Sequence, residues 1–352
     1  MWTLTALRGH AVGVIKRTIE ISREPLGVHL AVRDGQLLIL RKTEPPRPLP
    51  AHPPTLAGSV PCEDLGVLMV DQRDTTYSHS ALAALAENGA AVVVCGADHH
   101  PVGMYLPLAT NTHLLSRLDA QLNATRPTVK KLWASIVTAK VRAQARALPE
   151  GDDTAACRGK LLSLARSVRS GDPDNIEAQA AALYWPLIFA RASCLQHPFR
   201  RRAGERGAPP PNNLLDYGYA ALRAALARAL VSAGLLPALG IKHRGRSNPF
   251  CLADDLMEPL RPLVDQRVRW LAERGELELN QPVKAELLRV LTDEVGVRGQ
   301  RGPLLVAVVR YVASIVRVLE GEQADAEIPT WIEAAGGSTA GAASEPGAED
   351  GD

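Results

Sequence analysis

The chain has 352 residues, of which 46% are hydrophobic, 22% charged and 4% aromatic. This length and composition exclude a collagen-like, miniature or wholly disordered protein and predict a globular protein of two or three domains. The five cysteines are scattered without Cys-x-x-Cys spacing, so they indicate neither a disulfide framework nor a zinc ribbon. No apolar run reaches the roughly 18 residues of a membrane span, and we therefore expect a cytoplasmic protein without membrane contact.

The charged residues are distributed unevenly along the chain. The formal net charge is only +2, but residues 320–352 contain nine acidic residues and no lysine or arginine. The 40 basic residues therefore stand against 29 acidic residues in the preceding part, which carries a net charge of +11. This excess of positive charge suits a polyanionic partner.

Strand patterns dominate the first part of the chain, after residues 1–14, which we interpret as an extension. Apolar and β-branched runs alternate with turn signals, and the pair Asp34-Gly35 lies between two such runs, as in a β-hairpin. A short helix is indicated after Ser78. We therefore expect a small β-rich domain over residues 15–106. Its expected strands lie within 17–22, 27–42, 64–71 and 90–96, with a proline-rich loop at 44–54.

Helical patterns replace the strand patterns from His113 onward. Apolar residues such as Leu215, Leu222 and Leu226 recur at the spacing of one helix face. We expect an α+β protein whose small N-terminal domain is followed by a larger all-α catalytic domain over residues 107–320, and then a disordered acidic tail over residues 321–352. The expected helices lie near 113–146 (broken or bent around Pro127), 153–169, 174–195, 213–233, 255–274, 282–297 and 303–319.

Three acidic residues and a histidine are candidates for a metal site. Asp255 and Glu258 are three residues apart, so in a helix both carboxylates project from one face and could hold a hard divalent cation. The alternative is that Asp254 or Asp255 caps the helix. His243 lies twelve residues before Asp255 in a loop rich in lysine and arginine, where it is either a metal ligand or an ordinary loop residue.

Glu177 is the candidate for a further ligand. It lies near the start of an expected helix, on or beside the apolar face formed by Ala180 and Tyr184, and an acid on such a face requires a partner. The three-residue spacing from Asp174 also fits a capping box, in which Glu177 only satisfies the helix terminus. The residues alone leave both interpretations open.

Three stretches together resemble the CRISPR-associated spacer-acquisition integrase family, the catalytic subunit of CRISPR adaptation. They are NIEAQAAALYW at 175–185, the helix-to-loop stretch at 212–250 and LADDLMEPLRPLVD at 252–265. Motifs of the N-terminal domain add to the resemblance, which covers about residues 15–300. The residue sequences of the motifs PALGIKH and DDLMEP are most similar to those of family members from type II systems.

The resemblance implies the residues of the active site and their cofactor. In this family a glutamate, a histidine and an acidic residue on three segments coordinate a divalent metal, and the matching positions here are Glu177, His243 and Glu258. Asp255 is implied as an assisting acid. The implied cofactor is Mg²⁺ or Mn²⁺, whose preferred oxygen and nitrogen ligands these residues supply.

The resemblance also implies the reaction and the partners. The 3′-hydroxyl ends of a short captured double-stranded DNA would be joined to the CRISPR repeat by transesterification. The implied assembly is a homodimer, with dimerisation through the N-terminal domain, which joins a smaller partner dimer in a hetero-hexamer and works with other type II adaptation proteins. Two alternatives stay open: a non-catalytic DNA-binding assembly subunit, and a metal-dependent nuclease whose purpose is hydrolysis.

Two basic runs in the helical domain are candidates for DNA contact. Residues 116–146 contain seven lysines and arginines against one acid, and a second run lies within 191–206. Such runs are often solvated faces, but on a DNA-joining protein they suit phosphate binding. The expected DNA-contacting residues are Lys130, Lys131, Lys140, Arg142, Arg146, Arg200, Arg201, Arg202, Lys242, Arg244 and Arg246.

Overall fold

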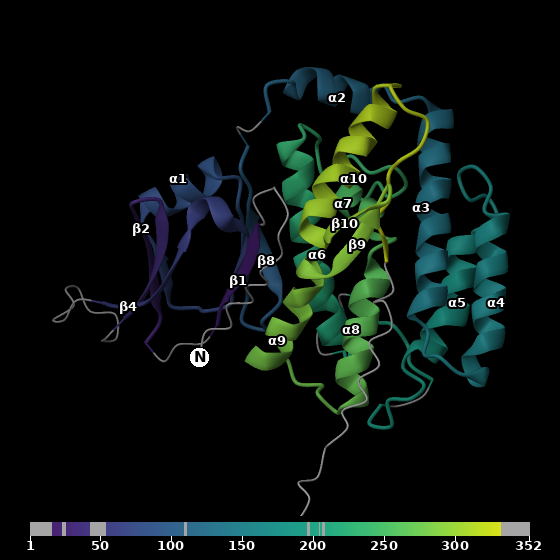
Figure 1. Cartoon of the computed structure of the whole chain (residues 1–352), viewed down its shortest axis with the longest axis horizontal. Helices are drawn as coiled ribbons and strands as arrows, with labels where there is room; N and C mark the ends of the chain where they lie inside the picture. Colours follow the sequence, from purple (N-terminus) through teal and green to yellow (C-terminus); the bar gives the residue numbers. More distant parts are fainter. Residues whose placement is uncertain are drawn as a thin grey trace, which may run out of the picture.

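The computed structural model describes residues 16–22, 26–42, 54–108, 111–195, 198–203, 205 and 208–331. The expected N-terminal extension, nearly all of the proline-rich loop and the end of the expected tail lie outside these residues. A β-rich part and a helical part lie side by side (Figure 1), so the expected α+β class is confirmed.

Two four-stranded sheets form the N-terminal part. The strands are β1 (Arg17–Ile21), β2 (Val28–Arg33), β3 (Gln36–Arg41), β4 (Thr55–Pro61), β5 (Leu65–Val70), β6 (Thr75–Tyr77), β7 (Ala91–Cys95) and β8 (Pro101–Tyr105). One sheet has the order β1-β5-β7-β8, and the other has the order β4-β3-β2-β6. The expected hairpin joins β2 and β3 through Asp34 and Gly35, which both have the positive φ that a tight hairpin turn requires.

Helix α1 (His79–Glu87) begins where the sequence predicts. The Ser78 hydroxyl accepts a hydrogen bond from the Ala81 N–H at 3.1 Å, as an N-cap residue does.

The β4, β6 and β8 strands were not expected. They are short or lie at sheet edges, and their sequences carry no sustained apolar alternation.

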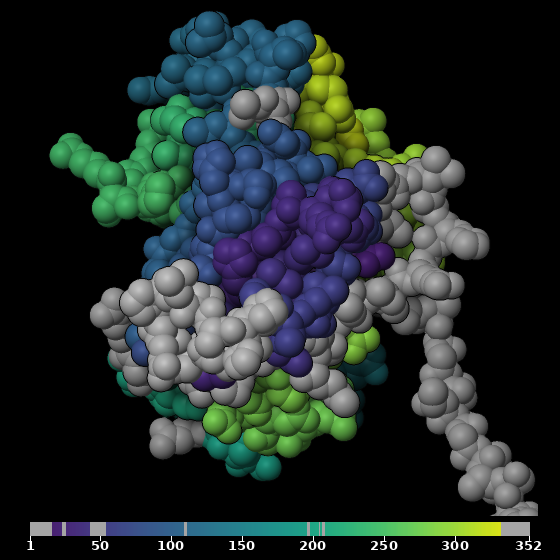
Figure 2. Space-filling model, turned by 90° about the vertical axis from the view of Figure 1, so that its left-hand side faces the viewer, coloured from purple at the N-terminus to yellow at the C-terminus, as the bar shows by residue number. Residues whose placement is uncertain are grey.

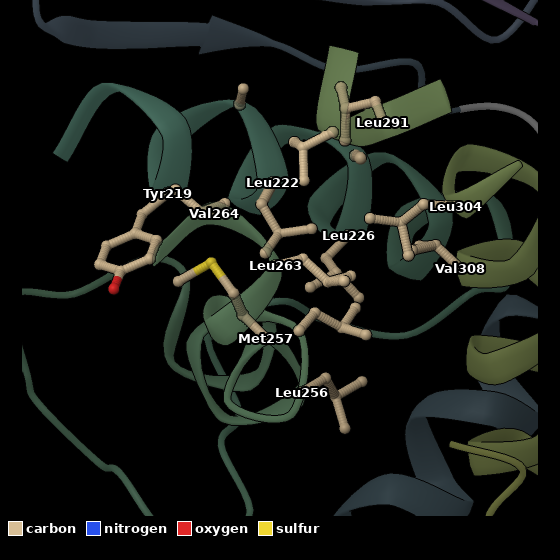
Figure 3. Close-up of a cluster of buried hydrophobic side chains, with 14 of the residues drawn as sticks. Tyr219, Leu222, Leu226, Leu256, Met257, Leu263, Val264, Leu291, Leu304 and Val308 are labelled. Atoms are coloured by element: carbon tan, nitrogen blue, oxygen red, sulfur yellow. The ribbon is translucent and has the colours of Figure 1, made fainter. Parts of the chain in front are cut away.

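The helical part is built around one buried helix. Its helices are α2 (Leu114–Leu122), α3 (Arg126–Ala147), α4 (Asp152–Ser167), α5 (Ile176–Ile188), α6 (Asn212–Ser232), α7 (Cys251–Met257), α8 (Arg261–Glu273), α9 (Gln281–Leu288) and α10 (Leu304–Leu319). Most residues of α6 are buried, since α7, α8, α9 and α10 all pack against it. Figure 3 shows Leu222 and Leu226 of α6 between Met257 on one side and Leu304 on the other.

Strands within the helical part correct the expectation that this part is all-α. Strands β9 (Glu294–Val297), β10 (Gln300–Pro303) and β11 (Thr330–Trp331) form an antiparallel sheet in the order β10-β9-β11. The helix expected over 282–297 therefore ends at Leu288. Alternating valines and a turn at Arg298 and Gly299, both with positive φ, favour a hairpin at this point.

Two other expected segments are each divided into two helices, and the tail begins later than expected. The 113–146 segment is broken near Pro127, as expected, because Thr125 caps α3 with Pro127 in its first turn. The 255–274 segment is likewise divided between α7 and α8. The expected disordered tail begins later than residue 321, since Trp331 of β11 pairs with Val295 and Glu327 pairs with Arg317.

The N-terminal sheet that contains β5 lies between two hydrophobic cores. Leu68 and Val70 point into the core of the β-rich part, whereas Val67 and Met69 belong to the core of the helical part. A strand covered on both faces reads as a continuous apolar run, which explains the sequence of β5. Figure 2 shows the purple and blue N-terminal elements covering one face of the molecule.

Candidate active site

Two glutamates from different helices meet around one lysine. Glu177 lies in the first turn of α5, Glu258 directly follows α7, and Lys140 lies on α3. The Lys140 Nζ is 2.7 Å from Glu177 Oε1 and 2.5 Å from Glu258 Oε2. Arg261 adds a second cation, with its Nη2 3.0 Å from Glu258 Oε1. The sequence-predicted acids of two distant segments are thus neighbours.

The charges of this cluster stabilise each other despite their burial. Burial alone would raise the pKa of Glu258, but Arg261 and Lys140 hold it below its ordinary value. Burial would likewise lower the pKa of the Lys140 ammonium, but Glu258 and Glu177 hold it above its ordinary value. Lys140 and Glu258 therefore both stay ionised at neutral pH.

His243 is oriented by the buried carboxylate of Asp255. The His243 Nδ1 is 2.5 Å from Asp255 Oδ1, and the backbone N–H of Lys242 donates to Asp255 Oδ2 at 2.8 Å. Any side chain at Gly240 would collide with the His243 carbonyl oxygen, so a glycine is required for the loop to close over Asp255. The hydrogen bond with Asp255 raises the pKa of His243 above its ordinary value. This bond leaves Nε2 as the nitrogen available to a ligand.

Helix α3 supplies a wall of the site through Trp133. The Trp133 ring meets the His243 ring edge-on, with 5.8 Å between centroids and 86° between planes. Trp133 is fully buried, and Lys140 lies seven residues further along the same helix face. The sequence analysis missed Trp133 and Arg261 as parts of the site. The i, i+7 spacing of Trp133 and Lys140 was the available signal, but it does not tell which face of α3 is turned toward the site.

The structure does not contain the capping box of Asp174 and Glu177 that the sequence left open. Asp172, not Asp174, caps α5, because its carboxylate accepts from the N–H groups of Ile176 at 2.8 Å and Glu177 at 3.1 Å. Asp174 instead pairs with Arg169. The capping box is therefore wrong, and the Glu177 side chain is free to meet Lys140.

The acids at the start of α7 are not caps either. This helix begins at Cys251, and the side chain of its N-cap residue, Phe250, accepts no hydrogen bond from the first turn. Asp254 pairs with Arg223 at 2.6 Å and accepts from Asn248, while Asp255 is turned toward His243. The two neighbouring carboxylates therefore have different tasks.

The residue types of the site, though not yet their spacing, suit a hard divalent cation. Among the described residues, no three His, Cys, Asp or Glu side chains come together closely enough to hold a metal ion. Glu177 and Glu258 nevertheless already enclose a cation, the Lys140 ammonium, and the charges of both glutamates also raise the pKa of His243. Two carboxylates and an imidazole are ligands that Mg²⁺ and Mn²⁺ accept.

Most of the expected DNA-contacting cations lie at the surface. Lys131 pairs with Asp325, and Arg146 donates to the Trp331 carbonyl oxygen. Two members of the set are engaged inside the protein: Lys140 by the glutamates, and Arg201 by Asp216. The exposed members are Lys130, Lys131, Arg142, Arg146, Arg200, Arg202, Lys242, Arg244 and Arg246.

A cleft lies beside the glutamate cluster. It has a volume of about 350 Å³ and is lined by three arginines, Arg201, Arg223 and Arg261, together with Tyr219. Arg261 also contacts Glu258, so this arginine links the cleft to the cluster. The same lining includes Asp98, Glu205 and Asp216, and all three guanidinium groups pair with carboxylates, so the cleft carries charges of both signs.

Comparison with known proteins identifies the family. The family model for "CRISPR associated protein Cas1" matches residues 26–297. The chain belongs to the Cas1 family. It is 42% identical over 295 residues to the CRISPR-associated endonuclease Cas1 of Neisseria meningitidis, with 82% of this chain and 88% of that relative covered. The resemblance noted in the sequence is thus confirmed, while the assignment to a type II system stays a prediction.

Solved structures share the Cas1 fold of this chain. A casposase bound to its integration product has a TM-score of 0.65 at 20% identity, covering 88% of this chain and 91% of the casposase chain. A Cas6-RT-Cas1–Cas2 complex has a TM-score of 0.68 at 16% identity, covering 91% of this chain and 36% of that chain. In the part of this Cas1-family chain that the structure describes, no helix is both long and apolar enough to cross a membrane.

Proposed function

We propose that this Cas1-family chain is a metal-dependent DNA endonuclease and integrase of CRISPR adaptation. It would join the 3′-hydroxyl ends of a short DNA to the CRISPR array by transesterification. The meeting of Glu177 and Glu258 around one cation, with charges that also act on the His243 imidazole, is the observation that carries the proposal. The names of the relatives support it, since the Neisseria protein is called an endonuclease and the casposase structure holds an integration product.

Each residue of the site has a task in this reaction. Glu177, Glu258 and the Nε2 of His243 would hold Mg²⁺ or Mn²⁺, which when bound supplies positive charge for the phosphoryl oxygens. Asp255 fixes the His243 ring, so that Nε2 is presented to the site. Arg261 keeps Glu258 ionised and lines the cleft beside it, where it is available to a DNA phosphate.

The surface cations would guide double-stranded DNA toward this site. Lys242, Arg244 and Arg246 flank His243 in one exposed loop. The exposed cations of α3 are Lys130, Lys131, Arg142 and Arg146, and Arg200 and Arg202 lie before α6. We further propose a cytoplasmic homodimer that binds a smaller partner dimer, because the Cas6-RT-Cas1–Cas2 structure is named as a complex with Cas2.

A strand-transfer assay tests the proposal. Purified full-length protein is mixed with short duplex DNA bearing free 3′-hydroxyl ends, a supercoiled repeat-bearing plasmid and Mn²⁺, with EDTA as the blank. We expect joined product that EDTA abolishes and that falls at least about 100-fold in Glu177→Ala and His243→Ala, because each variant loses a metal ligand. Glu87→Ala, an exposed glutamate of α1, is the matched control and should keep full activity.

The other outcomes separate the two alternatives. Nicking of the plasmid without joining would favour a hydrolytic nuclease. DNA binding without any reaction would favour an assembly subunit that has kept the fold. Full joining by both ligand variants, with unchanged melting temperatures, would refute the assignment of the site.

A further inference from the structure

Lys140 occupies an unusual position for a residue of a basic run. Its side chain is only 12% exposed, compared with 56% for Lys131 on the same helix. Its ammonium bridges Glu177 Oε1 at 2.7 Å and Glu258 Oε2 at 2.5 Å, two oxygens from helices that are distant in the sequence. In this arrangement Lys140 cannot also contact a DNA phosphate.

The ammonium lies where a cation between the two glutamates would have to lie. Both glutamate oxygens contact the one Nζ atom, and in the described part of the chain Glu177 has no other ion pair. A divalent cation bound by the same two oxygens would be repelled by an ammonium at contact distance. The lysine and the metal therefore exclude each other from this position.

The second cation of the cluster is held differently. Arg261 contacts the other oxygen of Glu258, Oε1, and its guanidinium lies over the Tyr219 ring at 5.1 Å from the centroid. Planar stacking and a separate carboxylate oxygen allow Arg261 to stay in place when a metal binds. The ammonium of Lys140 ends a flexible four-carbon chain and can swing away, so Lys140 is the exchangeable partner of Glu258.

We propose that Lys140 is an internal counter-ion that fills the cation position between Glu177 and Glu258 in the metal-free protein and leaves it when a divalent metal binds. This inference rests on the proposed metal-dependent function. Without metal, Lys140 neutralises Glu177 and screens it from the charge of Glu258, which stabilises the site. With metal, it opposes binding, so the metal affinity of the protein is weaker than its ligands alone would give.

Titration with Mn²⁺ alone tests the competition directly. Full-length protein, freed of metal with EDTA, is titrated with MnCl₂, and free Mn²⁺ is counted by electron paramagnetic resonance. We expect Lys140→Met to bind Mn²⁺ about tenfold more tightly with unchanged stoichiometry, because the competing charge is gone. Lys140→Arg keeps the charge, and Lys131→Met removes a charge elsewhere on α3, so both should stay within about twofold of the unchanged protein.

Thermal melting of the same proteins gives a second measurement. Without metal, Lys140→Met should melt at a lower temperature than the unchanged protein, and saturating Mn²⁺ should raise its melting temperature by more. A folded Lys140→Met protein with equal or weaker Mn²⁺ affinity would overturn the proposal. Absence of Mn²⁺ binding in every variant, or undiminished binding by Glu177→Ala, would instead refute the proposed metal-dependent function itself.

A measurement on the unchanged protein covers the case in which Lys140→Met does not fold. Lysines are labelled with an amine-reactive acylating reagent, and mass spectrometry compares the peptides that contain Lys140 and Lys131. Addition of Mn²⁺ should increase the labelling of Lys140 several-fold and leave that of Lys131 unchanged, since only Lys140 is released from buried partners. Unchanged labelling of Lys140 at saturating Mn²⁺ would overturn the proposal.

Discussion

At the scale of single residues, the neighbouring acids Asp254 and Asp255 have different partners and different roles. Asp255 is fully buried and accepts from the backbone N–H groups of Lys242 and His243 as well as from the imidazole. Asp254 faces the other way and pairs with Arg223. One of the two therefore orients the histidine, whereas the other holds α7 against α6.

We expect Asp255→Asn to lower strand-transfer activity and Mn²⁺ affinity by about 10- to 100-fold, as the loss of a carboxylate behind a ligating histidine does. The amide cannot accept from the imidazole and the backbone with the strength of the charged group. The assay is the plasmid joining reaction beside the Mn²⁺ titration. Asp254→Asn is the matched control, and an equal loss in both variants would show that Asp255 has no special role.

The candidate ligands could be predicted from the sequence, but their surroundings could not. The motifs gave the residue types of Glu177, His243 and Glu258, and the local spacing gave the helices that carry them. Lys140 is 37 residues from Glu177 and much further from Glu258, so no local pattern indicates which of several lysines turns inward. Such pairing is decided by the packing of α3, α5 and α8 and becomes visible only in three dimensions.

At the scale of elements, α6 and α8 approach each other closely at a glycine. A Cβ atom at Gly218 would lie 2.5 Å from Cγ1 of Val264, so the glycine allows the two helices to approach. A β-branched valine in a helix has few alternative rotamers and cannot turn away freely. Gly159 of α4, in contrast, is exposed and has open space around it.

We expect Gly218→Ala to lower the free energy of unfolding by about 1–2 kcal/mol, because overpacking outweighs the better helix propensity of alanine. Gly159→Ala has no such conflict and should raise the free energy of unfolding by about 0.5–1 kcal/mol. Urea denaturation followed by circular dichroism measures both. If Gly218→Ala is as stabilising as Gly159→Ala, the close approach of α6 and α8 does not constrain the fold.

At the scale of the whole molecule, a buried ionic cluster ties the N-terminal sheet to the helical part. Lys284 of α9 pairs with Asp71, which follows β5, and its ammonium is 3.9 Å from Glu20 of β1. His99 adds its Nδ1 at 2.9 Å from Asp71. Lys284 is 213 residues from Asp71 in the sequence, so the strands and helices were predictable but this junction was not.

We expect Lys284→Met to lower the free energy of unfolding by about 3–5 kcal/mol, because it leaves Asp71 and Glu20 buried without their counter-ion. Adding Asp71→Asn to that variant should restore part of the loss, since it removes one of the unpaired charges. Chemical denaturation of the single and double variants gives the coupling energy. If the losses in the free energy of unfolding are additive, Lys284 and Asp71 do not stabilise each other.

Glu20 makes the stability of this junction depend on pH. Burial raises the pKa of Glu20 to about 7, although Lys284 opposes the shift. A carboxyl group with a raised pKa binds its proton more tightly in the folded than in the unfolded protein. Its contribution to stability is therefore present at low pH and is lost as the pH rises from about 4.5 to 7.

We expect the free energy of unfolding of the unchanged protein, relative to that of Glu20→Gln, to fall by on the order of 2 kcal/mol between pH 5 and 8. Urea denaturation across this range measures the difference, and Glu87→Gln, which alters an exposed glutamate, should run parallel to the unchanged protein. Parallel curves for Glu20→Gln as well would show that Glu20 is ionised throughout and that Lys284 fully compensates its burial.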